Sequence, residues 1–218
     1  MKSKVTPTQR ALNLWAIVLI IWAIYRAKFK MPEWFDEFIA KPSVFILPVY
    51  YYVTKVEKKA FLEAINLKLK FILSDLMVAF SIGGVFVLSA ILANFIKFKK
   101  FIFLQQTFNP QDVLLIVAIA LATGISEEIL SRGFILKRLY EESKNIYTSS
   151  FFASILFFFL HIPILFTKAS ITGNLLLTIM GTDLALSLIN SFIFLETRNL
   201  IVPILIHAFY NLSIVFFL

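Results

Sequence analysis

The sequence predicts an all-α fold, a polytopic transmembrane helical bundle. Composition is the first reason, because 60% of the 218 residues are hydrophobic and only 16% are charged. A soluble domain is nearer to half apolar and about a quarter charged. The second reason is that the apolar residues form long runs of the length that crosses a bilayer.

Seven such runs can be compared with the roughly 20 residues that a helix needs to cross about 30 Å of hydrocarbon. They cover residues 11–29, 42–54, 71–96, 112–136, 147–166, 171–195 and 199–218. The run at 42–54 is short and contains Pro42 and Pro48, so it is re-entrant, interfacial or joined to its neighbour. We therefore expect six to eight spans.

The first run is preceded by basic residues, as in a signal peptide, but it is long and ends in Lys28 and Lys30. Small residues suited to cleavage are missing there, which favours a retained anchor. The connecting segments contain no linker rich in Gly, Ser or Pro. We expect a single membrane domain over residues 1–218.

The net charge is +8, and the basic residues lie mostly in the segments between the runs. With seven spans, the side of the N-terminus collects 12 Lys and Arg and the other side 8, while Arg132 remains inside a run. This bias places the N-terminus in the cytoplasm. The positive charge is expected to meet anionic lipid head groups, not nucleic acid.

The chain has no cysteine, which excludes disulfides, thiolate metal sites and a cysteine nucleophile. Ionisable groups inside apolar runs are costly and mark a function or a buried pair. Away from the ends of the runs there are few of them: Glu127, Glu128, Arg132, His161, Asp183 and His207, with Asp75 near the entrance of its run.

Helical spacing relates several of these residues to one another. Glu128 and Arg132 are four apart in the favourable order, so they are expected to pair. Glu127 lies about 100° further round the helix and is expected to remain free. His207 and Asn211 are also four apart, which points both side chains towards one place.

Three motifs follow one another along the chain: Glu127-Glu128-x-x-x-Arg132, Phe157-x-x-x-His161 and His207-x-x-x-Asn211. In this order they resemble the motifs of the CPBP family, which comprises the type II CAAX prenyl proteases and the bacteriocin-processing or self-immunity membrane proteases, also called the Abi family. The resemblance covers roughly residues 112–218, the motif-bearing core, whereas residues 1–111 match only as generic spans.

The resemblance implies a helical bundle whose polar cavity opens within the membrane towards the cytoplasm and accepts a peptide. It implies that Glu127 is the general base for water, that His161 assists, and that His207 and Asn211 stabilise the oxyanion. Glu128 and Arg132 would support this arrangement. Two further residues are expected near the site: Phe157 under His161, and Asp183 as an interhelical contact or cavity lining.

The sequence thus predicts an intramembrane peptidase, embedded in the cell membrane or, in a eukaryote, in the endoplasmic reticulum membrane. Its expected partners are membrane lipids and a peptide or lipidated protein, and CAAX, leader-peptide and immunity roles fit equally. The alternative is a non-enzymatic transporter or an immunity or scaffold protein, because buried carboxylates and histidines also build proton relays.

Metal dependence is a separate alternative. Glu127 or Glu128 with His161 and His207 could hold zinc and leave a position open for water. The sequence lacks the His-Glu-x-x-His spacing that puts two ligands on one turn. We therefore expect no metal cofactor.

Overall fold

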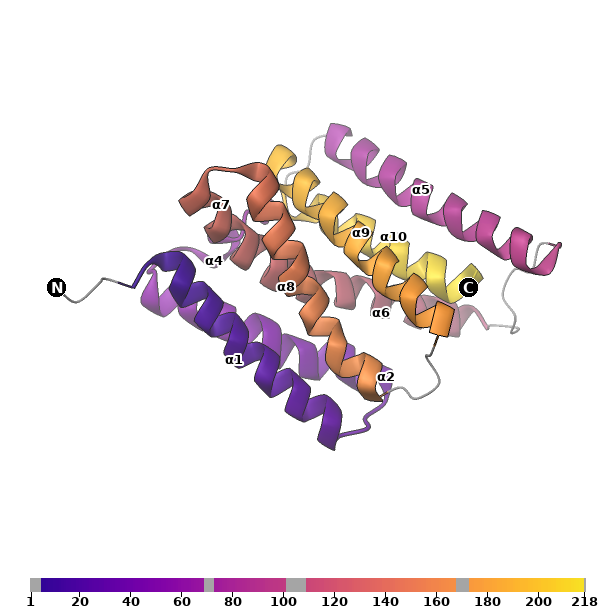
Figure 1. Cartoon of the computed structure of the whole chain (residues 1–218), viewed down its shortest axis with the longest axis horizontal. Coiled ribbons are helices and arrows are strands. Elements are labelled where there is room, and N and C mark those ends of the chain that lie inside the picture. Colours follow the sequence, from indigo (N-terminus) through magenta and orange to yellow (C-terminus); the bar gives the residue numbers. More distant parts are fainter. Residues whose placement is uncertain (1–4, 69–72, 101–108, 168–172, 218) are drawn as a thin grey trace.

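The structure is a computed structural model that describes residues 5–68, 73–100, 109–167 and 173–217 (Figure 1). The described residues form helices and no strand, so the predicted all-α class is confirmed. The long helices are α1 (Pro7–Lys28), α5 (Leu73–Phe98), α8 (Ile146–Thr167), α9 (Gly173–Thr197) and α10 (Ile201–Phe217). A further continuous helix joins α6 (Pro110–Glu128), the π-helical η4 (Ile129–Leu136) and α7 (Lys137–Ser143).

In the described part of the chain, five helices are long and apolar enough to cross a membrane. They are α1, α5, the continuous helix from Pro110 to Ser143, α8 and most of α9. Helix α10 is apolar but shorter, at 17 residues. Five of the predicted runs therefore coincide with candidate spans.

The second predicted run is part of a longer helix than expected. The backbone stays helical from Glu33 to Val56, alternating between α and π turns. Its segments are α2 (Glu33–Phe35), η1 (Asp36–Ala40), η2 (Pro42–Ile46), α3 (Leu47–Tyr51) and η3 (Tyr52–Val56), and the short α4 (Phe61–Ala64) follows. The prediction of a run at 42–54 missed the first turns because they carry acidic and basic residues, which the fold buries.

Helix α10 is the central element, packed against α5, α6 and α9, while α8 packs between α9 and α1 (Figure 1). One apolar core joins α1, the 33–56 helix, η4 and α8, and includes Trp22, Phe45 and Phe134. A smaller core, around Leu186 and Ile206, joins α5, α9 and α10. The three motifs therefore lie on α6, α8 and α10, which α9 and η4 join into one bundle.

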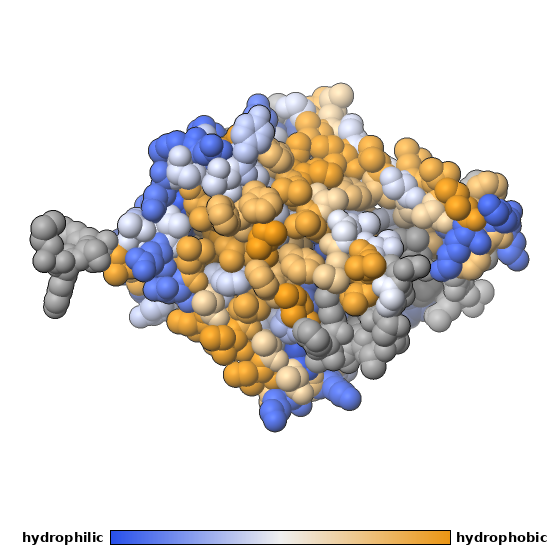
Figure 2. All heavy atoms as spheres, viewed as in Figure 1, coloured by the Kyte–Doolittle hydropathy of each residue, from blue (hydrophilic) through white to orange (hydrophobic). Residues whose placement is uncertain are grey.

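The surface is apolar over the visible face of the helices, and hydrophilic residues gather towards the helix ends (Figure 2). Large apolar side chains such as Leu88, Leu92 and Leu114 are more than half exposed. Exposed apolar area on this scale has to be covered by lipid or by another protein.

Helix α1 defines the two ends of the bundle. At its start, Thr8 Oγ1 donates to the carbonyl of Arg138 at 2.9 Å, beside α7. At its other end, Tyr25 donates to Asp36 Oδ1 at 2.5 Å, and Arg26 pairs with the same carboxylate. We call these the N-terminal end and the opposite end.

Candidate active site

The Glu127–Glu128 pair lies at the middle of the continuous helix from Pro110 to Ser143. The helix begins at Pro110, which suits a first helical position, and Asp112 Oδ2 accepts from the Asn109 backbone N–H at 3.1 Å. The helix continues through η4 and α7 to Ser143, beyond the predicted run at 112–136. A π-helical stretch follows the glutamates directly, a feature frequent at functional sites.

Glu128 is fully buried, and its Oε1 accepts from three side chains. Arg132 donates at 2.9 Å, Asn190 Nδ2 at 3.0 Å and His207 Nδ1 at 2.8 Å. The second nitrogen of the Arg132 guanidinium donates to the carbonyl and hydroxyl of Ser187 at 3.0 and 2.7 Å. The predicted ion pair is confirmed, and it also ties α6 to α9 and α10.

Glu127 has two differently occupied carboxylate oxygens. Its Oε1 accepts from the Lys41 ammonium at 2.7 Å. Its Oε2 lies 3.4 Å from His161 Nε2 and 3.7 Å from His207 Nε2, and has no hydrogen-bond partner. The predicted convergence of Glu127, His161 and His207 is therefore confirmed, while their catalytic roles remain predictions.

The expectation that Glu127 is free of a counter-charge was wrong. Lys41 is only 3% exposed and bridges two carboxylates, Glu127 and Glu37, each at 2.7 Å. Glu37 is fixed in turn by Thr123, whose hydroxyl donates to Oε2 at 2.7 Å. The i,i+4 spacing of Glu37 and Lys41 was visible in the sequence, but nothing local linked it to α6.

Phe157 lies beneath both imidazoles, as predicted for His161. Its ring centre is 4.6 Å from that of His161 and 5.9 Å from that of His207. The guanidinium carbon of Arg132 lies 4.5 Å from the same ring centre. The Phe157 ring therefore contacts the guanidinium and both imidazoles.

The hydrogen bonds of the two histidines determine which ring nitrogen carries the proton. His207 Nδ1 donates to the Glu128 carboxylate, and His161 Nδ1 donates to the Phe157 carbonyl at 3.1 Å. In a neutral imidazole the other nitrogen is then an acceptor. Both Nε2 atoms, on the side of Glu127 Oε2, can accept a hydrogen bond when neutral and donate one only when the ring is protonated.

Asn211 lies beside the cluster, and its predicted convergence with His207 stays a prediction. His207 bonds to Glu128, whereas Asn211 lines a groove of about 220 Å³ beside the cluster. The other lining residues are Glu33, Glu37, Ile116, Ile119, Ala120, Thr123, Ile214 and Val215. Thr123 is one turn before Glu127 and Asn211 one turn after His207, so the groove adjoins the cluster on the side of the opposite end.

Asp183 forms the predicted interhelical polar contact. The Tyr210 hydroxyl donates to its Oδ1 at 2.6 Å and lies 2.8 Å from the Thr182 hydroxyl. This contact joins α9 to α10 one turn beyond His207.

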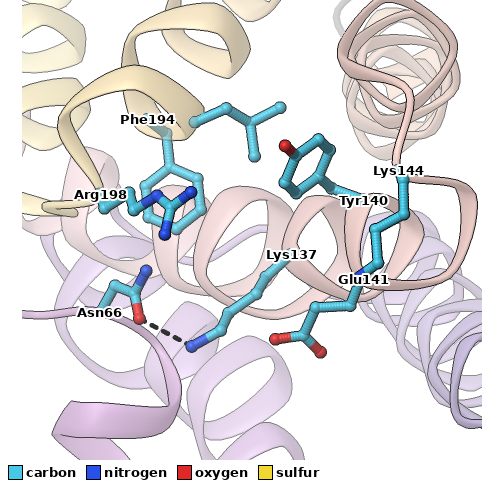
Figure 3. Close-up of a pocket in the computed structure, with 8 residues that line it drawn as sticks. Asn66, Lys137, Tyr140, Glu141, Lys144, Phe194 and Arg198 are labelled. Carbon is cyan, nitrogen blue, oxygen red and sulfur yellow. Dashed lines mark hydrogen bonds between the residues drawn. The ribbon is translucent and has the colours of Figure 1, made fainter.

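A second pocket, of about 290 Å³, lies at the N-terminal end and contains none of the motif residues (Figure 3). Lys137 points across it and donates to Asn66 Oδ1 at 2.7 Å. Its other basic residues, Lys144 and Arg198, directly follow the last turns of α7 and α9. Cations are favoured at helix C-termini, so their position needs no ligand to explain it.

Fold and site together define a polytopic helical membrane protein with a buried carboxylate–imidazole cluster. Residues 109–213 match the family of the type II CAAX prenyl endopeptidase Rce1-like proteins. The matched segment carries all three motifs, and the family is the one that the motifs resemble. No curated protein and no solved structure is significantly similar to the chain.

Proposed function

We propose that the protein is a membrane-embedded endopeptidase in which Glu127 activates water to hydrolyse a peptide bond. One observation carries the proposal: a buried carboxylate oxygen without a hydrogen bond, Glu127 Oε2, lies between the Nε2 atoms of His161 and His207. The family of the matched segment supports the reaction class.

Glu127 Oε2 and the imidazole Nε2 atoms lie close enough together to orient one water molecule. A water placed between Glu127 Oε2 and a neutral imidazole can donate one hydrogen to each, which leaves its lone pair for the substrate carbonyl. As the carbon–oxygen bond forms, the proton passes to Glu127. When the carbon–nitrogen bond breaks, the same proton can move to the departing amine.

The tetrahedral intermediate needs a donor for its oxyanion. Because His207 Nδ1 is committed to Glu128, only a protonated His207 ring can donate from Nε2. The buried charges allow one such proton: three carboxylates (Glu37, Glu127, Glu128) face two cations (Lys41, Arg132), which leaves one negative charge. We propose that a protonated imidazole balances that charge and that Asn211 contacts the substrate backbone in the groove.

We propose that the substrate is a membrane-associated peptide or lipidated protein, since the groove lies among spanning helices. The reaction needs no metal in this proposal, because Lys41 already supplies a cation to Glu127 Oε1. Within the described residues, no three His, Asp or Glu side chains are placed to hold a metal ion together.

The deciding experiment is hydrolysis of farnesylated CAAX peptides and of unmodified leader-type peptides by protein reconstituted in liposomes. We expect Glu127→Gln to abolish turnover, and His161→Ala and His207→Ala to lower kcat by about 10²-fold or more. Glu142→Gln, exposed on α7, is the matched control and should keep wild-type activity. Dialysis against a chelator should leave the wild-type rate unchanged.

Two results would contradict the proposal. Full activity in all three site variants would remove the cluster from the reaction. Uptake into proteoliposomes that depends on Glu127, with no peptide ever cut, would instead establish the transporter alternative.

A further inference from the structure

Lys41 is the strongest feature that the motifs do not explain. It lies outside the matched segment 109–213, on the helix from Glu33 to Val56, yet its ammonium is buried against the proposed general base. Burying an ammonium costs several kcal/mol of desolvation free energy unless the charge is paired. The two carboxylates around Lys41 compensate this cost, and they hold the ammonium against Glu127.

We infer that Lys41 is a positioning residue for hydrolysis, which binds Glu127 Oε1 and thereby presents Oε2 to the water and the two imidazoles. The inference rests on the proposed function. Through Lys41, the N-terminal half of the chain then contributes a residue to the active site.

The Lys41 ammonium is held by one carboxylate of its own helix and one of α6. Glu37, one turn earlier on the same helix, accepts from the ammonium at 2.7 Å, and Thr123 holds the second oxygen of Glu37. Thr123 is also one turn before Glu127 on α6. The chain of contacts therefore begins and ends on α6, and leaves the ammonium little freedom to move away from Glu127.

The two oxygens of Glu127 show what this contact does. A carboxylate can rotate, and both of its oxygens accept hydrogen bonds. With Lys41 on Oε1, the oxygen left without a partner is the one 3.4 Å from His161 Nε2. Without Lys41, either oxygen could turn away from the imidazoles, and the negative charge of Glu127 would lose its closest cation.

The competing explanation is that Lys41 only fastens the 33–56 helix to α6. Arg26 offers a matched control, because it pairs with Asp36, the neighbour of Glu37, and fastens the same helix to α1. Arg26→Met breaks a partly buried ion pair of the same helix without touching Glu127.

The experiment compares steady-state hydrolysis by Lys41→Met and Arg26→Met in liposomes, using whichever peptide the wild-type protein cleaves. We expect Lys41→Met to lower kcat by about 10²-fold while KM changes by less than about three-fold. Arg26→Met should keep kcat. If Lys41→Met fails to fold, Lys41→Met with Glu37→Gln preserves the net charge of the cluster and should show the same loss of kcat.

Chemical rescue separates charge from packing, because the chain has no native cysteine. In Lys41→Cys, alkylation by 2-bromoethylamine forms a carbon–sulfur bond with loss of bromide and restores an ammonium at nearly the original place. Iodoacetamide adds a neutral group of similar size. We expect the amine alone to restore kcat.

The outcomes are distinguishable. If the wild-type protein cleaves no peptide, the proposed function fails and this inference with it. If the wild type is active and Lys41→Met keeps kcat within about three-fold, or iodoacetamide rescues as well as the amine, the inference is overturned and Lys41 is a structural fastener.

Discussion

The two adjacent glutamates have different surroundings. Glu128 directs one oxygen at Arg132, Asn190 and His207, and is fully buried. Each glutamate keeps one oxygen without a hydrogen-bond partner, but only that of Glu127 lies near the Nε2 atoms of His161 and His207, at 3.4 and 3.7 Å. A carboxylate oxygen within reach of an imidazole nitrogen can share a proton with it through one water.

The Glu128–Arg132 pair gives the first prediction, on stability. Arg132→Met leaves a fully buried carboxylate without its cation, which should lower the free energy of unfolding by about 3–5 kcal/mol. Replacing both residues, with Glu128→Gln and Arg132→Met, removes the uncompensated charge and should recover part of that loss. Denaturant unfolding in detergent measures both values. A single variant as stable as the wild type would show that the charge is compensated elsewhere.

At the scale of elements, hydropathy alone predicted most of the helices, because spans are continuous apolar runs. The 33–56 helix shows the limit of this approach. Its first turns contain Asp36, Glu37 and Lys41, and a hydropathy pattern assigns such residues to a loop. Their burial depends on partners on other helices, since Lys41 and Glu127 are 86 positions apart.

The site could be predicted as far as its residues share helix faces. The i,i+4 rule gave the Glu128–Arg132 pair, and the order of the motifs gave the set Glu127, His161 and His207. It could not give the contact of Lys41 with Glu127, or the hydrogen bond of His207 to Glu128. Both depend on how α6, α10 and the 33–56 helix pack, which no local pattern contains.

Helices α5 and α10 approach each other closely, and two adjacent glycines test this contact. A Cβ at Gly83 would overlap the Phe209 side chain, whereas one at Gly84 would meet nothing within 4 Å. We expect Gly83→Ala to destabilise by about 1–3 kcal/mol through overpacking. Gly84→Ala should be neutral or stabilise by up to about 1 kcal/mol through helix propensity. Thermal unfolding in detergent provides the comparison, and equal effects would refute the close contact.

At the scale of the whole molecule, the structure links two expectations about orientation. The sequence favours a cytoplasmic N-terminus from the distribution of basic residues, and the family resemblance favours a cytoplasmic cavity. The groove, however, adjoins the opposite end of the bundle, where Glu33 follows α1. A cytoplasmic N-terminus therefore places the groove on the other side of the membrane, and a cytoplasmic groove places the N-terminus outside.

Single cysteines in this cysteine-free chain can test the arrangement in intact cells. Met31→Cys marks the groove side and Glu142→Cys the N-terminal end, and both positions are exposed. Because α1 and the helix from Pro110 to Ser143 each cross the bundle, we expect an impermeant maleimide to label the two positions from opposite sides of the membrane. The distribution of basic residues favours labelling of Met31→Cys from outside the cell and of Glu142→Cys from inside.

Labelling of both positions from one side would contradict the spanning arrangement. Labelling of Met31→Cys only after permeabilisation would place the groove in the cytoplasm, where a prenylated protein could reach Glu127.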